Sequence, residues 1–170
     1  FKGAKGILSA LNKKAETTST VSGLLGLAAG LAGQQKSADS LASASEMASM
    51  LKDIPFDSIA IQVERGADAA VVVKSIEVLS PSVHLTGSGR IDHQPGTDFG
   101  MSPLTLDFQL AAKDQLANAL NRARQLDGKT DSQGYYLMAT PFTMRGTLAK
   151  PDSSDFWKNL TLNTGASFLR

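Results

Sequence analysis

The sequence SPSVHLTGSGRID, from Ser80 to Asp92, decides the fold. Apolar side chains occupy every second position, with Gly87 and Gly89 in the same phase, and polar side chains fill the positions between them. This alternation is typical of a β-strand with one apolar and one polar face. A second alternating run follows over residues 104–110. The apolar positions of the two runs are Val83, Leu85, Ile91, Leu104, Leu106, Phe108 and Leu110.

Two more strands are predicted upstream of this stretch. The first begins at Phe56 and ends at a turn over residues 65–68, and the second covers residues 70–79. In the second strand the apolar residues are first odd-numbered and then even-numbered. Since a slip of one residue would turn the apolar side over, we expect a bulge or sharp bend near Lys74 and Ser75. The apolar positions of the two strands are Ile59, Ile61, Val63, Val71, Val73, Ile76 and Val78.

Helical spacing returns downstream, over residues 114–126. Residues 127–134 are rich in turn formers and are predicted to form a mobile loop. Two last strands are expected over residues 135–140 and 142–148, and a final short helix over residues 152–160. The apolar residues of the last strand are Phe142, Met144 and Leu148, and those of the last helix are Phe156, Trp157 and Leu160.

The N-terminal part, residues 1–54, is predicted to be helical. Ile7, Leu8 and Leu11 fit one face of a short helix. A longer helix is expected to begin near Ser37 or Ser40 and to end before Pro55, because a residue that precedes proline avoids the helical region.

The segment VSGLLGLAAGLAG, Val21 to Gly33, is apolar and rich in glycine. Its length falls short of the roughly twenty residues that a membrane-spanning helix needs. Two interpretations stay open. In the first, the segment is a buried helix whose glycines let a neighbouring element approach; in the second, it lies at a membrane interface.

This order of elements predicts an α+β fold. N-terminal helices are expected to pack on a curved, mainly antiparallel sheet of about six strands, with a helix inserted between the fourth and fifth strands. The short connection at Gly66 favours a hairpin between neighbouring strands. We expect a helical segment over residues 1–54 and a sheet domain over residues 55–170, together forming one compact unit cut from a larger protein.

Composition narrows the function classes. The chain has 170 residues, 17 Lys and Arg against 16 Asp and Glu, and a net charge of +1. It has no block of like charge, so nothing in the sequence indicates a nucleic-acid partner. The chain contains no cysteine, which excludes disulfide bonds and thiolate chemistry.

Residues for catalysis are sparse. His84 falls on the polar side of its strand and His93 in a loop, and both are expected to be solvated surface residues. No cluster has the spacing of metal ligands, and no cofactor is expected. The GSG triplet at residues 87–89 resembles part of a phosphate-binding loop, but it lies inside a strand and opens no helix. We therefore expect a protein that is not an enzyme.

Several weak motifs in series resemble the C-terminal domain of the AsmA family. The first is FDSIAIQVERGADAAVVVKSIEVLSPSVHLTGSGRID (Phe56 to Asp92), in which one strand ends in Ser-Pro and the next in Gly-x-Ile-Asp. The second is PFTMRGTLAKPDSSDF (Pro141 to Phe156), with a Gly-Thr-Leu-x-x-Pro exit. The resemblance covers residues 51–160. His93 departs from it, since the family more often has an apolar residue there, and the helix over residues 114–126 looks like an elaboration.

The resemblance implies a large envelope protein of a Gram-negative-type bacterium. Such a protein is periplasmic and is anchored in the inner membrane by a helix that lies outside this chain. It takes part in phospholipid transport between the two membranes, or in outer-membrane homeostasis, through an apolar groove of β-sheet. Acyl chains would slide along the groove while the headgroups stay hydrated.

The sequence leaves three functions in competition. Under the lipid hypothesis the apolar sheet face contacts acyl chains of a phospholipid. Under the second hypothesis the same residues form an ordinary closed core, and the domain is a structural or protein-interaction module of envelope assembly. An enzyme built around His84 or His93 is the third. The candidate lipid-binding residues are Ile59, Ile61, Val63, Val71, Val73, Val83, Leu85, Ile91, Leu104, Leu106, Phe108, Leu110, Phe142, Met144 and Leu148.

Overall fold

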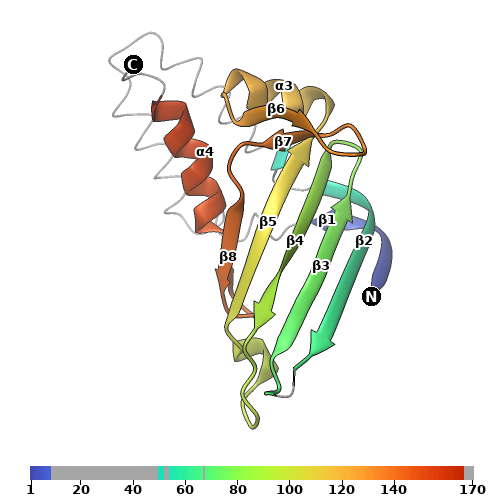
Figure 1. The fold of residues 1–170 in the computed structure, drawn as a ribbon, viewed down its shortest axis with the longest axis vertical. Helices are drawn as coiled ribbons and strands as arrows, with labels where there is room; N and C mark the ends of the chain where they lie inside the picture. The colour runs from blue at the N-terminus through green and yellow to red at the C-terminus, as the bar shows by residue number, and fades with distance from the viewer. Residues whose placement is uncertain (9–49, 52–53, 67, 167–170) are drawn as a thin grey trace.

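The fold is an open antiparallel sheet, with one helix at its upper end and another along its left edge in Figure 1. The computed structural model describes residues 1–8, 50–51, 54–66 and 68–166, with side chains described up to residue 160. Its elements are β1 (Lys2–Leu8), β2 (Ile54–Arg65), β3 (Val71–Leu79), β4 (Val83–Ile91), η1 (Phe99–Met101), β5 (Leu104–Ala112), α3 (Asp114–Arg122), β6 (Leu126–Thr130), β7 (Tyr136–Met138), β8 (Phe142–Gly146), β9 (Pro151–Asp152) and α4 (Ser154–Ala166).

The strands follow one another through the sheet in the order β1-β2-β3-β4-β5-β7-β6, and every pair is antiparallel. β8 also pairs with β5, at Leu106–Phe108, while β7 pairs with the end of β5 at Ala111 and Ala112. The long strand β5 is therefore shared by two partners on its outer edge. The antiparallel α+β prediction is confirmed, but the described residues form nine strands, where about six were expected.

The predicted bulge in β3 is present. Val73 pairs with Gly89 and Ile76 with Gly87, so β3 has one more residue than β4 between these two pairs. The pairing of β3 with β2 shifts at the same place, between Gln62 and Val63. The extra residue returns Ile76 to the face that Val73 occupies, which explains the phase change in the sequence.

One face of the sheet is apolar in continuous rows that cross several strands. One row runs Ile59, Val78, Leu85 and Leu110 through β2, β3, β4 and β5. A second runs Ile61, Ile76, Gly87, Phe108 and Phe142, and a third runs Val63, Val73, Gly89, Leu106 and Met144. The alternation of each strand thus adds up to a single apolar surface.

The helix α4 covers the β8 side of this surface. Phe156 is completely buried, and its ring meets that of Phe142 edge-on at 4.9 Å between centroids. Phe142 in turn stacks on Phe108, with centroids 5.4 Å apart. The predicted helical face of Phe156, Trp157 and Leu160 therefore packs against the sheet core as expected.

The two helices predicted downstream of the first strands are present, as α3 and α4, but the described helices with given bounds include none of the predicted N-terminal ones. α3 lies between β5 and β6, and α4 follows β9. The helix expected to end before Pro55 is described only at Met50 and Leu51, and Ile54 already begins β2. The possible starts at Ser37 and Ser40 and the glycine-rich segment of residues 21–33 lie outside the described residues.

Residues 2–8 form a strand, so the short helix predicted from Ile7 and Leu8 is wrong there. β1 pairs along β2, from Lys2 opposite Ala60 to Leu8 opposite Ile54. The glycines of this segment disfavour a helix, and a partner far away in sequence supplies the backbone hydrogen bonds.

The helix predicted over residues 114–126 is shorter than expected. It ends at Arg122, and Arg124 has a φ of 55°, a left-handed conformation that reverses the chain. Leu126 then begins β6, which pairs with β7, so the predicted loop of residues 127–134 begins as part of a hairpin. Near the C-terminus Pro151 lies within β9, opposite Gly146, where the sequence had suggested only a strand end.

Candidate functional site

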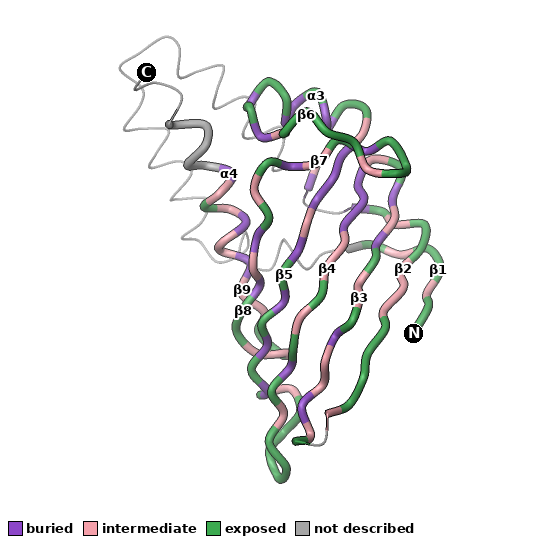
Figure 2. The backbone as a smooth tube through the Cα atoms, viewed as in Figure 1, coloured by how far each residue is buried: buried purple, intermediate pink, exposed green. Residues whose placement is uncertain are grey.

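The candidate lipid-binding residues share one sheet face but differ in accessibility (Figure 2). Ten of them are buried in the described structure: Val73, Val83, Leu85, Ile91, Leu104, Leu106, Phe108, Leu110, Phe142 and Met144. Ile59, Ile61, Val71 and Leu148 are half-buried, and Val63 is 59% exposed. The apolar face is therefore closed on β4, β5 and β8 and increasingly accessible towards β2.

The accessible part, which we call the β2–β3 strip, consists of Ile59, Ile61, Val63, Val71 and Ile76. Ile61 lies directly opposite Ile76, so the strip spans both strands. Ile76 was not among the candidate lipid-binding residues, since its position in the sequence is out of phase with Val71 and Val73. The bulge in β3 returns it to the same face. A large apolar side chain such as Val63, left accessible beside a core, marks a potential contact surface.

Gly87 and Gly89 shape the middle of the face. A Cβ atom at Gly87 would lie 2.4 Å from the ring of Phe108, so the phenylalanine ring occupies the space above this glycine. Gly89 has a φ of +156°, and a Cβ atom there would lie 2.1 Å from the carbonyl oxygen of Thr105 on β5. Both glycines therefore allow β4 and β5 to approach more closely than a side chain at these positions would permit.

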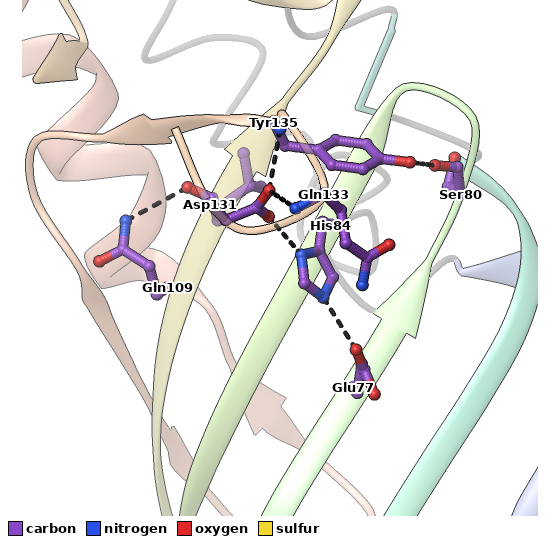
Figure 3. A network of polar contacts seen from close by, with 8 residues as sticks. Glu77, Ser80, His84, Gln109, Asp131, Gln133 and Tyr135 are labelled. Atoms are coloured by element: carbon purple, nitrogen blue, oxygen red, sulfur yellow. Dashed lines mark hydrogen bonds and ion pairs between the residues drawn. The ribbon is translucent and has the colours of Figure 1, made fainter. Parts of the chain in front are cut away.

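The opposite face carries a buried polar network around His84 (Figure 3). The imidazole Nδ1 lies 2.5 Å from Asp131 Oδ2, and Nε2 lies 3.1 Å from Glu77 Oε1. His84 is only 8% exposed, so the prediction of a solvated surface histidine is wrong at this position. A partner 47 residues away in sequence covers it, which local pattern alone does not reveal.

Asp131 organises the turn between β6 and β7. Its Oδ1 accepts hydrogen bonds from the backbone N–H groups of Gln133 and Tyr135, both at 2.9 Å. Burial acts to raise the pKa of Asp131, but the hydrogen bond from His84 and those from the two backbone N–H groups outweigh it and hold the pKa below its ordinary value. The carboxylate is thus kept charged beside the imidazole.

Tyr135 fastens the same turn to the sheet. Its hydroxyl donates a hydrogen bond of 2.8 Å to the backbone carbonyl of Ser80, and the Lys113 ammonium lies 3.9 Å above its ring. Burial, followed by the negative charges of Asp131, Asp57 and Asp114, raises the pKa of the Tyr135 hydroxyl. The phenol therefore stays protonated and able to donate.

The second histidine lies beyond the other end of β4. His93 is half-buried, its Nδ1 is 2.9 Å from Ser102 Oγ, and the ring of Phe99 meets it edge-on. His84 lies at the start of β4, so the structure does not bring the two histidines together. At the same lower end, Arg90 is hydrogen-bonded to Asp92 and Asp68, which raises the pKa of its guanidinium and lowers that of Asp68.

The described part of the chain contains neither a metal-binding cluster nor a helix that could span a membrane. No group of three or more His, Asp or Glu side chains there is placed to hold a metal ion. None of the helices described is both long and apolar enough to cross a bilayer.

Comparison with known proteins found no matching family model, no matching curated protein and no matching solved structure.

Proposed function

We propose that this chain is a lipid-handling domain of the AsmA type, which holds acyl chains of a phospholipid against the β2–β3 strip. The observation that carries the proposal is the accessibility gradient of the apolar face. Leu110 on β5 is 1% exposed, whereas Val63 on β2, two strands away from β4, is 59% exposed. An apolar surface that begins as a core and continues into an accessible strip suits a ligand that is itself apolar.

The physical basis is the transfer of methylene groups from water. Each methylene that moves onto an apolar surface gains about 0.8 kcal/mol when fully buried. Ile59, Ile61 and Val63 follow one another on the same face of β2, so an acyl chain that lies along this strand meets no polar side chain between Ile59 and Val63. Gln62 and Glu64 point to the other face, in the phase of the hydrated side of β2.

A cationic group stands at one end of the strip. Arg65 follows Val63 in the same phase, is exposed, and lies opposite Val71 at the end of β2. A guanidinium in this position suits the phosphate of a headgroup, which it can bind with two parallel hydrogen bonds. We assign the protein, on the same proposal, to the periplasm, held to the inner membrane by a segment outside this chain.

The proposal is tested by purifying the full chain from cells and identifying co-purified phospholipids by mass spectrometry. The variants Ile61→Asp and Val63→Asp should keep the fold, measured by circular dichroism, and lose bound lipid. Gln62→Asp, on the opposite face of the same strand, is the matched control and should retain lipid. A wild-type chain without lipid, or equal lipid in Val63→Asp and Gln62→Asp, would contradict the proposal.

Substitutions deeper in the face do not serve this purpose. Leu106 and Phe108 are buried on β5, opposite Met144 and Phe142 of β8. A charge at either position would unfold the domain whether or not it binds lipid. The substitutions that can separate lipid binding from folding are therefore those in the β2–β3 strip.

One observation favours a second candidate, a strand-pairing interaction module. Within the described residues β1 pairs only with β2, so its other edge offers backbone groups to a further strand. Ile7 on this strand is 66% exposed. If the edge associates, sedimentation should show concentration-dependent complexes that Ile7→Lys weakens and Val63→Asp does not.

A further inference from the structure

Besides the pairing of β7 with β5, side-chain contacts of Asp131 and Tyr135 hold the turn between β6 and β7 to the sheet. The hairpin base is fixed separately, where Ala139 N–H donates to the Gln125 carbonyl at 2.8 Å and Leu126 pairs with Met138. The tip is held through Asp131 and Tyr135, which reach His84 and Ser80 on the sheet. Base and tip therefore have independent attachments.

The protonation state of His84 decides how many of these attachments the imidazole can make. Both ring nitrogens face a carboxylate oxygen, Asp131 at 2.5 Å and Glu77 at 3.1 Å. A neutral imidazole has one N–H and one acceptor nitrogen, whereas the imidazolium donates from both. With both carboxylates ionised, only the imidazolium can donate to both of them.

Charged groups from several elements surround the imidazole. Glu77 on β3 and Asp131 in the hairpin are negative, and Lys113, after β5, is the positive group beside Tyr135. Asp57 and Asp114 add negative charge that acts on Tyr135, whose ring centroid is 5.6 Å from that of His84. Around the imidazole the carboxylates therefore outnumber the ammonium.

We propose that His84 is a pH-sensitive latch that fastens the tip of the β6–β7 hairpin to the polar face of the sheet. With the second proton bound, His84 bridges β3 and the hairpin through two charge-assisted hydrogen bonds. On loss of that proton Glu77, whose side chain is 49% exposed, turns to water. The remaining bond to Asp131 then has a neutral donor and loses the attraction between opposite charges.

The direction of the pH dependence follows from these bonds. The latch is weakened as the pH rises and the imidazole loses its second proton. At the acid end it is lost as the pH falls through the lowered pKa of Asp131, where that carboxylate becomes protonated. The hairpin tip is therefore held most firmly between these two titrations.

Amide hydrogen exchange by NMR tests the latch. Protection factors, corrected for the intrinsic pH dependence of exchange, are measured for the Tyr135 and Ala139 amides from about pH 5 to about pH 9, the range in which histidine titrates. The ¹⁵N shifts of the His84 ring are followed in the same samples. We expect the Tyr135 protection factor to fall about tenfold along the His84 titration. Ala139, at the base, should keep its protection.

Matched variants separate the latch from general destabilisation. His84→Gln should show low Tyr135 protection at every pH, and His93→Gln should behave as the wild type. Glu77→Gln, which keeps an acceptor oxygen but removes the negative charge, should move the loss of protection to lower pH, and it serves if His84→Gln fails to fold. Constant Tyr135 protection across the His84 titration, or parallel loss at Ala139, would overturn the proposal.

Discussion

At Gly89 the backbones of β4 and β5 leave no room for a side chain. Alanine there would adopt a φ of +156° and place its Cβ 2.1 Å from the Thr105 carbonyl oxygen. We expect Gly89→Ala to lower the free energy of unfolding by about 2 kcal/mol or more, measured by urea denaturation. Gly96→Ala is the control, because Gly96 also has a positive φ, of +85°, but has nothing within 4 Å of the added Cβ. Equal losses in the two variants would show that close approach is unimportant.

Asp131 gives the domain an acid-sensitive contribution to stability. Its folded-state pKa is lowered, so the contribution is present above the ordinary carboxyl pKa and is lost as the pH falls through the lowered value. Asp131→Asn should therefore cost about 1–3 kcal/mol at neutral pH and much less in acid, measured by urea denaturation.

Asp127 provides the comparison for that measurement. It accepts a hydrogen bond from Lys129 N–H in the same hairpin and has no described histidine partner. Asparagine can keep such a turn, so Asp127→Asn should change stability little at either pH. A loss in Asp131→Asn that is the same in acid and at neutral pH would show that its charge plays no part.

The local sequence predicts only some of the neighbours of His84. Alternation placed His84 correctly on the polar face of its strand. The turn at Ser80 and Pro81 brings β3 back beside β4, and this predicts that Glu77 comes near. Asp131 comes from another hairpin, and no local pattern identifies it. A histidine expected to be solvated is therefore buried.

At the scale of elements, the bulge in β3 makes a deletion informative. Without Lys74 the residues Val73 and Ile76 would become strict alternate positions opposite Gly89 and Gly87. We expect deletion of Lys74 to preserve the fold at a cost of about 1–2 kcal/mol, part of it from the lost ion pair with Glu64.

Deletion of Val72 is the matched test of this interpretation. It shifts a regular part of the strand by one residue, which would turn Val71 to the polar face. The variant should lose much more stability than the Lys74 deletion, as measured by circular dichroism during urea denaturation. If the Lys74 deletion were the more harmful of the two, the bulge would be required for the fold itself.

Sequence pattern predicted β2 to β5 because each of these strands alternates and neighbours the next along the chain. It failed for β1 and β6. The segment KGAKGIL of β1 has almost no alternation, and β6 carries Asp127 and Gly128, which are typical of turns. Both are strands because a partner supplies their backbone hydrogen bonds, and that information is not local.

For the whole molecule, the two faces of the sheet have different roles. The apolar face closes into a core under α4 and continues to the accessible β2–β3 strip. The polar face carries the His84 cluster and the hydrogen bond between Thr143 and Asp107. The apolar face was predictable as a surface, but its division into closed and accessible parts depends on how α4 and β8 pack.

The place of β1 at the edge of the sheet has a consequence for the order of folding. β2, β3 and β4 are joined by short connections, β4 and β5 by residues 92–103, and these four strands can form as successive hairpins. β1 must instead find β2 across residues 9–53, so its loop closure costs more entropy than that of any of these hairpins. We expect the amides of residues 2–8 to become protected last in pulse-labelling experiments. Until they do, the edge of β2 stays unpaired, and a nascent domain is at its most vulnerable to association with another chain.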